Sequence, residues 1–420
     1  MKRGFYTIMA AQFFSSLADN ALLIAAIALL IEMHAPDWMK PLLKLFFTIS
    51  YVMLAPFVGS FADSMPKGRV MLITNAIKVI GCAMMFASVH PLLAYAVVGF
   101  GAAAYSPAKY GILTELLPPE KLVAANGWIE GTTVGTIILG TVLGGVLISP
   151  RISGGLLALD LPYIDTGIDT PAESAIAVIA LVYALAALFN FRIPDTGARY
   201  PRQQTNPLRL IADFAKCLSM LWRDKLGQIS LAVTTMFWGA GATLQFIVLK
   251  WAEVQLGMPL SKAAILQGVV AVGVAIGAVV AARFVPLRGS LRVLPFGVAM
   301  GVLVPIMTMV HELSIAYPLL VLIGAMAGFF VVPMNALLQH RGHVLMSAGH
   351  SIAVQNFNEN LAVLLMLGLY ALMINFDWHI NTVITLFGST VAIAMLLVIR
   401  QHKINQAKHD SIAEIGHASH

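Results

Sequence analysis

Gly59-Ser-Phe-Ala-Asp-Ser-Met-Pro-Lys-Gly-Arg69 separates two apolar runs, at residues 41–62 and 69–89. Each run is close to the ~20 residues with which an α-helix crosses the hydrocarbon core of a bilayer. Gly59 allows a neighbouring helix to approach closely, so that Asp63 can reach a basic group or a helix end. The segment therefore predicts a conformational latch between two membrane spans, formed by Gly59, Asp63, Gly68 and Arg69.

Similar apolar runs fill most of the 420 residues, of which 59% are hydrophobic and 11% charged. Soluble domains carry about 25% charged residues, so the composition points away from a soluble enzyme. Membrane spans are helical because every backbone polar group must be satisfied inside the segment. We predict about twelve spans, at 5–31, 41–62, 69–89, 91–112, 124–149, 173–191, 227–250, 262–284, 292–311, 314–335, 350–375 and 379–399.

The basic connection at 192–226 divides these spans into two groups of six. Within it, Leu208, Ile211 and Leu218 recur at helical spacing, and Asn206-Pro207 is a typical helix start. This pattern predicts an amphipathic helix along the inner membrane surface, with a solvated linker helix as the alternative. The predicted division is 1–191, with an acidic loop at 150–172 that contains Asp160, Asp165 and Asp169, followed by 192–226, 227–400 and a tail at 401–420.

Basic residues fall mostly on one side if the spans alternate, and the positive-inside rule makes that side cytoplasmic. Both termini are therefore predicted in the cytoplasm. The net charge of +6 reflects this asymmetry, and no nucleic-acid partner is expected. The first span extends to about Ile31 and contains Asp19, so it is predicted to be retained rather than removed as a signal peptide. The side-determining residues are Lys67, Arg69, Lys121, the cluster in 192–226, Arg283, Arg288, Arg292, Arg341, Arg400, Lys403 and Lys408.

The loop after span 8 repeats the loop after span 2. Gly277 corresponds to Gly59, and a basic cluster follows each glycine, whereas the acid is lost in the second copy. Six plus six spans with a repeated inner loop predict two parallel repeats around a central site. The expected fold is an all-α membrane protein with two six-helix bundles around a central cavity.

Residues 59–69 resemble the signature of the major facilitator superfamily, although Ser64-Met65-Pro66 places Asp63 farther from Gly68 than the usual spacing. Longer segments resemble the bacterial lysophospholipid transporter family over nearly the whole chain. The loop at 150–172 departs from the short loop of that family. The segments that carry the resemblance are AQFFSSLADNALL at 11–23, GAAAYSPAKYGIL at 101–113, TTMFWGAGATLQF at 234–246, PMNALLQHRGH at 333–343 and AVQNFNEN at 353–360.

The resemblance implies a major-facilitator fold in the inner membrane of Gram-negative bacteria. The alternating spans separately predict that the 150–172 loop is periplasmic. The resemblance also implies movement of lysophospholipids, mainly lysophosphatidylethanolamine, from the outer to the inner leaflet without coupling to a proton or sodium gradient. A cytoplasmic acyltransferase–acyl carrier protein synthetase then re-acylates the lipid. Membrane lipids are the remaining expected partners, and no cofactor is expected.

Ionisable residues inside spans cost about 2.5–3.5 kcal/mol each on insertion scales and are candidate site residues. Asp19, Ser16 and Gln12 share one helical stripe of span 1, which either lines the cavity and holds an ammonium headgroup or forms a structural pair with a neighbouring base. Lys78 in span 3 is the expected structural partner of another residue. Lys109, after Pro107, either points inward or snorkels to the cytoplasm.

A second polar stripe, in span 11, is expected to line the cavity and contains Gln355, Asn358 and Glu359 together with Ser351. Lys250 either receives the lipid phosphate from the outer leaflet or anchors span 7 at the interface. Glu130 in span 5 is expected to be an inner-gate acid that belongs to the conformational latch, or a structural acid. The histidines His340, His343 and His350 lack a carboxylate or cysteine to complete a metal site, so no metal site is expected.

Two other functions compete with lipid movement. A superfamily exporter of hydrophobic drugs would exchange protons through Asp19 or Glu359. A membrane-bound acyltransferase would need a histidine followed by aspartate at the spacing His-x4-Asp, or a nucleophile with a base at a membrane face. No histidine is followed by aspartate at that spacing, so no catalytic residue is predicted. The family resemblance favours lipid movement over drug export.

Overall fold

The computed structural model describes residues 3–35, 39–158, 168–201, 206–258, 260–408 and 410–415. These residues form α-helices, short 3-10 helices and connections, without a strand. The α-helices are α1 Arg3–Glu32, α2 Met39–Asp63, α3 Lys67–Phe86, α4 Pro91–Leu116, α5 Leu122–Leu147, α6 Pro150–Leu157, α7 Pro171–Phe191, α8 Pro207–Arg223, α9 Lys225–Leu256, α10 Leu260–Phe284, α11 Leu294–Leu303, α12 Leu313–Leu345, α13 Ala348–Asn375 and α14 Ile380–Lys408. The 3-10 helices are η1 Pro119–Lys121, η2 Leu287–Val293, η3 Val304–Met309 and η4 Ser411–Glu414.

Twelve helical segments in the described residues are long and apolar enough to cross a membrane, which confirms the predicted all-α membrane fold. The ninth span differs from the single helix predicted at 292–311, because it consists of η2, α11 and η3 in succession. Pro305 lies in η3 and cannot donate the backbone hydrogen bond that an α-helix requires there. The predicted connection at 150–172 contains α6, while Asp160 and Asp165 lie outside the described residues.

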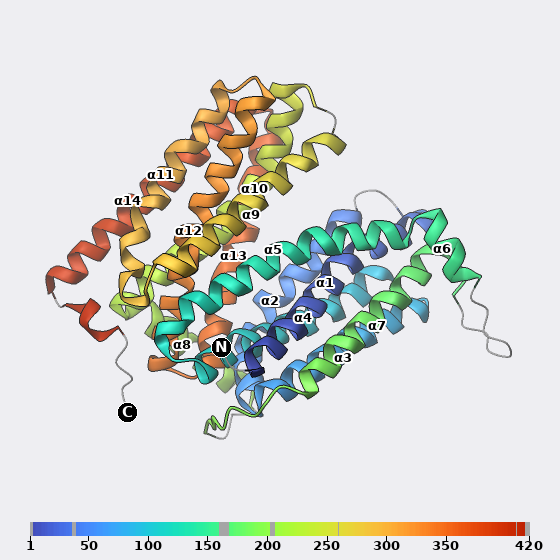
Figure 1. Cartoon of the computed structure of the whole chain (residues 1–420), viewed down its shortest axis with the longest axis horizontal. Helices are drawn as coiled ribbons and strands as arrows, with labels where there is room; N and C mark the ends of the chain where they lie inside the picture. Colours follow the sequence, from blue (N-terminus) through green and yellow to red (C-terminus); the bar gives the residue numbers. More distant parts are fainter. Residues whose placement is uncertain are drawn as a thin grey trace. The chain divides into compact units, whose positions relative to one another are not determined.

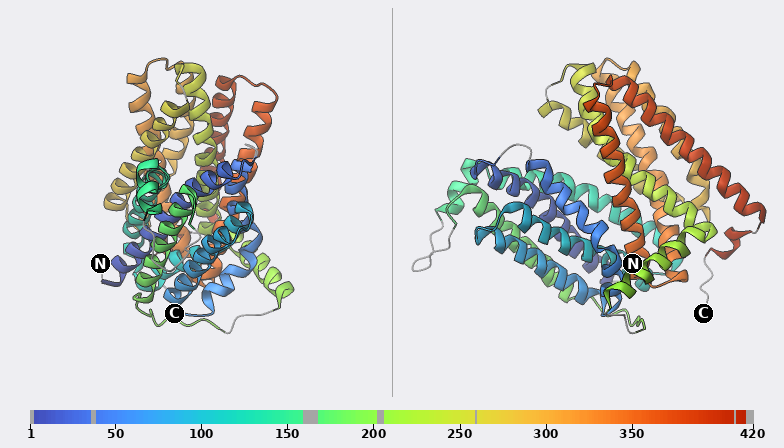
Figure 2. Two further views of the ribbon diagram at one scale, coloured as in Figure 1. Left: turned by 90° about the vertical axis from the view of Figure 1, so that its right-hand side faces the viewer. Right: turned by 180° about the vertical axis from the view of Figure 1, so that it is seen from behind.

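The chain forms two compact units, in each of which helices lie side by side as a bundle (Figures 1 and 2). Unit 1 comprises Met1–Leu116, Gly135–Phe214 and Ala348–Ala353. Unit 2 comprises Leu117–Val134, Ala215–Ser347 and Val354–His420. The start of α5 thus groups with unit 2, and the first residues of α13 group with unit 1.

The core of unit 1 forms where α1 packs against α7 and α3 packs against α4. On α1, Ala18, Leu22 and Ala25 are fully buried, and Ile179 and Tyr183 are fully buried on α7. Lipid tails are as apolar as leucine, so bundles in membranes are held mainly by close packing and polar contacts. Small residues on α1 allow that close packing and bring the polar groups of α1 within reach of α7.

Unit 2 contains a seam of glycines where α10 crosses α12. A Cβ atom at Gly273 or Gly277 of α10 would collide with the backbone of α12, and one at Gly324 or Gly328 of α12 would collide with the backbone of α10. The glycine that repeats Gly59 in the sequence, Gly277, therefore lies at a helix crossing. Figure 1 shows the two helices running together.

Antiparallel packing joins α11 to α14 in the same unit (Figure 1). Gly297 faces Met395, and Gly301 faces Gly388 one to two turns further along. The numbers rise along α11 as they fall along α14. The start of α11 therefore lies level with residues near 400 of α14.

Candidate functional site

Asp19 and Lys78 form a buried ion pair inside unit 1, between α1 and α3. The Lys78 ammonium lies 2.8 Å and 2.9 Å from the two carboxylate oxygens of Asp19. Tyr183 of α7 donates to the same carboxylate at 2.7 Å. The Lys78 side chain is 1% exposed, whereas that of Asp19 is 21% exposed. The pair is thus closed on the lysine side and partly open on the carboxylate side.

Neighbouring residues fix the position of Lys78. Its ammonium also donates to Ser15 at 3.0 Å, and Ser15 donates to Asn75 at 2.8 Å. The ring of Tyr105 lies beneath the ammonium at 5.0 Å, within the range of a cation–π contact. Gly101 makes room for the lysine, because a Cβ atom there would lie 2.8 Å from Lys78 Cγ. These contacts, with the room left by Gly101, hold the Lys78 ammonium beside Asp19.

The rest of the predicted span 1 stripe follows the same line along α1. Ser16 shares a hydrogen bond of 2.9 Å with Thr136 of α5. Gln12 is buried one turn further on. Removing one member of a buried ion pair costs about 3–5 kcal/mol because the other charge stays behind. The Asp19–Lys78 pair is for this reason a strong constraint on the helices that carry it.

The predicted latch residue Asp63, at the end of α2, has several partners in unit 1. It forms an ion pair with Lys67, accepts from the Gly349 N–H at 3.1 Å, and contacts His350 Nδ1 at 2.9 Å. Gly349 and His350 stand in the first turn of α13, where a carboxylate is favoured by the helix dipole. A Cβ atom at Gly59 would lie 2.9 Å from His350 Cα, so the glycine permits this approach.

A second acid, Glu115 of α4, extends this cluster and was not identified from the sequence. Its carboxylate lies 3.6 Å from the Lys67 ammonium and accepts from Thr196 at 2.7 Å and Tyr200 at 2.9 Å. Burial and Glu115 raise the pKa of Tyr200 well above its usual value, so its hydroxyl stays protonated and can donate. The only sequence signal was an acid near a predicted span end, which also fits an interfacial residue.

The other predicted latch residues contribute differently. Arg69 is exposed. Gly68 packs against Ile193, and a Cβ atom at position 68 would lie 3.0 Å from the Cβ of Ile193. Outside the cluster, Arg199 and the Gly197 N–H lower the pKa of Asp195 to about 2. The Arg199 and Asp195 side chains of that bridge are 65% and 46% exposed, whereas the Asp63 and Lys67 side chains are 0% and 2% exposed. The buried acids, not the surface bridge, therefore have the contacts that the predicted latch requires.

In unit 2 the predicted stripe of span 11 divides between two neighbours. Gln355 donates to Glu359 at 2.7 Å and to Asn335 of α12 at 3.1 Å. Asn358 instead accepts from Trp222 of α8 at 3.2 Å. Glu359 is buried, at 7% exposure. The structure thus brings Glu359 and Gln355 together and places Asn358 against the amphipathic helix.

The two other basic candidates lie at more open positions. Lys250 forms an ion pair of 3.0 Å with Glu253 on its own helix, and its side chain is 41% exposed. Its neighbour Trp251 is fully buried and donates to the Met307 carbonyl at 2.9 Å. Lys109 is half-buried, with its ammonium 4.2 Å above the ring of Tyr110. Lys78 is therefore the base that the structure places beside Asp19.

Comparison with known proteins identifies the family. Residues 8–366 match the family model of the Major Facilitator Superfamily. A lysophospholipid transporter LplT of Yersinia enterocolitica is 44% identical over 375 residues, which cover 89% of this chain and 88% of the relative. A lysophospholipid transporter LplT of Yersinia pestis strain Pestoides F is 43% identical, with 89% and 87% covered. The chain belongs to the lysophospholipid transporter family of the major facilitator superfamily.

Solved structures of distant superfamily members share the fold of this lysophospholipid transporter family member. The human organic anion transporter MFSD10 aligns with a TM-score of 0.74 at 15% identity, covering 96% of this chain and all of that one. A bacterial homologue of the iron transporter ferroportin in an outward-facing state aligns with a TM-score of 0.70 at 14% identity, covering 97% and 100%. At these identities the comparison supports the fold alone.

For a transporter of this family, Glu130 and the histidines remain to be placed. The side chain of Glu130 lies outside the described residues, although its backbone belongs to α5. Among the described residues, histidines, cysteines and acids form no cluster suited to a metal ion. His350 instead contacts Asp63 and shares a 3.0 Å hydrogen bond with Ser60. The described residues of this family member thus present buried acid–base pairs rather than a metal cluster.

Proposed function

We propose that the protein moves lysophospholipids such as lysophosphatidylethanolamine from the outer to the inner leaflet of the bacterial inner membrane. The relatives at 43–44% identity carry the name lysophospholipid transporter, which supports this substrate class. The released lipid then becomes available to an acyltransferase–acyl carrier protein synthetase at the cytoplasmic face. Movement occurs by alternating access of the two repeats, without coupling to an ion gradient.

The observation that carries the proposal is the Asp19–Lys78 pair, a buried acid and base 2.8 Å apart. A lysophosphatidylethanolamine headgroup carries one cationic amine and one anionic phosphate. The amine can replace Lys78 at the Asp19 carboxylate while the phosphate takes the Lys78 ammonium. Such contacts are stronger in a low-dielectric site than in water. The exchange leaves the site neutral, so no co-transported ion is required.

In this proposal Lys78 takes the role at the bound phosphate, because it is the base beside Asp19. Lys250, which is exposed at the surface of unit 2, acts before the lipid reaches Asp19 by attracting the lipid phosphate. Glu359 and Lys109 take part in the conformational change, and Gln12 adds a polar group to the Asp19 stripe. Gln355 and Asn358 orient span 11 through Glu359 and Trp222.

The decisive experiment removes the charges singly and together. Asp19→Asn and Lys78→Met are each expected to reduce uptake of fluorescent lysophosphatidylethanolamine into spheroplasts strongly, normalised to protein in the membrane. The double variant Asp19→Asn/Lys78→Met removes the unpaired charge and should regain thermal stability without regaining uptake. Recovery of uptake by the double variant would show that the pair is structural only. Tyr183→Phe is the matched control, because it removes one hydrogen bond and no charge.

Purified protein in liposomes tests the absence of ion coupling. Transport should continue when an ionophore collapses an imposed proton gradient. Its loss, with the protein intact, would favour the alternative of a proton-coupled exporter of hydrophobic drugs, in which Asp19 or Glu359 carries the proton.

A further inference from the structure

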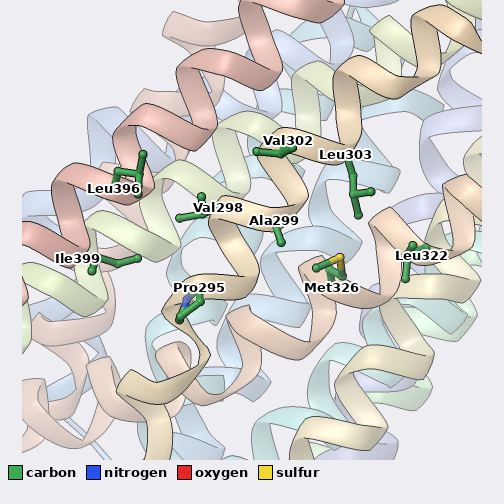
Figure 3. A pocket seen from close by; sticks show the side chains of 9 residues that line it. All are labelled: Pro295, Val298, Ala299, Val302, Leu303, Leu322, Met326, Leu396 and Ile399. Atoms are coloured by element: carbon green, nitrogen blue, oxygen red, sulfur yellow. The ribbon is translucent and has the colours of Figure 1, made fainter.

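An apolar groove on unit 2 lies apart from the polar residues discussed so far. It encloses about 630 Å³ between α11, α12 and α14, within the range of ligand pockets. All nine side chains that line it are apolar, and Figure 3 shows them converging from the three helices. The three helices belong to spans Leu287–Met309, Leu313–Leu345 and Ile380–Lys408. Hydrocarbon is the chemistry that this lining accepts.

One end of the groove is basic. The lining residues of α11 recur at helical spacing from Pro295 to Val302, and Arg292 precedes Pro295 by three residues. On α14, Leu396 and Ile399 line the groove, and Arg400 stands one turn beyond Leu396. Figure 3 places Pro295 and Ile399 toward the same end. The antiparallel packing of α11 on α14 sets Arg292 and Arg400 level with one another beside that end.

These two arginines are available to a ligand. Both are exposed, and among the described residues neither forms a hydrogen bond or an ion pair. Lys403 continues the α14 stripe one turn beyond Ile399. Arg288 is already engaged, since it donates to the Ile415 carbonyl at 3.1 Å. Phe329 of α12 packs on Phe296 of α11 with ring centroids 4.7 Å apart, a contact that brings no acid.

We infer that this groove binds an anionic diacyl phospholipid of the surrounding membrane, with one acyl chain in the groove and its phosphate at Arg292 and Arg400. An acyl chain gains little binding free energy when it moves from the bilayer into an equally apolar groove. The acyl chain therefore determines where the lipid sits, but not which lipid is preferred. The choice comes from the headgroup, because basic pockets between membrane helices favour lipids with net negative charge. This site is independent of the transport substrate and of Asp19.

Native mass spectrometry of the delipidated full-length protein in detergent tests the inference. The probes are phosphatidylglycerol, phosphatidylethanolamine and lysophosphatidylethanolamine with matched acyl chains. Phosphatidylglycerol should bind at least about tenfold more tightly than the other two. Arg292→Gln/Arg400→Gln should weaken phosphatidylglycerol binding about 30-fold, and Arg292→Lys/Arg400→Lys should retain most of it. Arg151→Gln, which removes an exposed arginine of unit 1, should have no effect.

A second pair of variants tests the groove itself. Val302→Trp fills the groove and should release the lipid, whereas Leu397→Trp enlarges an equally exposed side chain of α14 outside it and should not. Equal binding of the three lipids, or unchanged binding in the double glutamine variant, would overturn the inference. So would loss of an oligomer rather than of lipid in Val302→Trp, since the groove would then be an interface between copies.

Discussion

Asp63 concentrates several interactions on one buried side chain, so its charge is expected to matter more than that of any surface acid. In Asp63→Asn, Glu115, at 3.6 Å, is the one acidic partner that Lys67 keeps among the described residues. Loss of one partner from a buried pair costs about 3–5 kcal/mol, so the melting temperature should fall clearly and uptake with it. Asp195→Asn breaks the exposed bridge to Arg199 and should change neither. Equal effects of the two variants in a thermal-shift assay would contradict the latch.

Lys250 offers a test at the surface of the protein. Lys250→Arg keeps the charge and the hydrogen-bond donors and should be tolerated, whereas Lys250→Glu should repel the lipid phosphate and lower uptake about tenfold or more. Glu253→Gln removes its present partner and serves as the control, with little effect expected. If Lys250→Glu shows wild-type uptake in spheroplasts, Lys250 does not attract the phosphate and only anchors span 7 at the interface.

Individual acids could be identified from the sequence, but their partners could not. Asp19 stands out because a charge in the middle of an apolar span needs an explanation. Lys78 is the partner of Asp19 because of the way α1 and α3 are rotated about their axes. The sequence pattern does not encode this rotation. Glu115 was missed for the same reason, since only the path of residues 196–200 brings Thr196 and Tyr200 to it.

At the scale of single helices, the residue that precedes α9, Asp224, has two structural roles. Asp224 caps α9 by accepting from the Gly227 N–H at 2.7 Å, and it binds Arg341 of α12 through bonds of 3.0 Å and 2.6 Å. Asp224→Asn keeps an oxygen for the cap but loses the charge, and Asp224→Ala loses both. Asp224→Ala should therefore be about 1 kcal/mol less stable than Asp224→Asn, because an N-cap usually contributes about that much.

Arg341→Gln is the matched control, because it breaks the ion pair and leaves the cap intact. Its melting temperature should therefore resemble that of Asp224→Asn. A stability of Asp224→Ala equal to that of Arg341→Gln would show that the cap contributes nothing.

Helix lengths were predicted best where apolar runs end at clear polar punctuation. The tenth span was predicted at 314–335, but α12 continues to Leu345. Its polar last turns stay helical and buried because Gln339 exchanges two hydrogen bonds of 2.9 Å with Asn126, and Arg341 pairs with Asp224. Hydropathy ends a span at such residues, whereas tertiary partners extend it.

At the scale of the whole molecule, orientation is a direct test of the twelve-span arrangement. A reporter fused after His420, or inserted into the 192–226 loop, should be cytoplasmic. A reporter at 150–172 should be periplasmic. Reporter activity on the opposite side at any of these positions would contradict the predicted orientation.

The number of spans and the fold class could be predicted because they follow from hydropathy and the positions of basic loops. The exact division into compact units could not. Residues 117–134 and Ala348–Ala353 group across the linear order of the chain. Each begins the fifth span of its half. Such an exchange depends on tertiary contacts rather than on local composition.

The glycine seam between α10 and α12 has a mechanical consequence. The backbones of the two helices contact each other at Gly273, Gly277, Gly324 and Gly328, so the helices are closely packed along this seam. A shift of either helix by one residue would drive a larger side chain into its neighbour's main chain. We therefore expect α10 and α12 to move as one rigid body in a change of state, and any sliding within unit 2 to occur between the other helices.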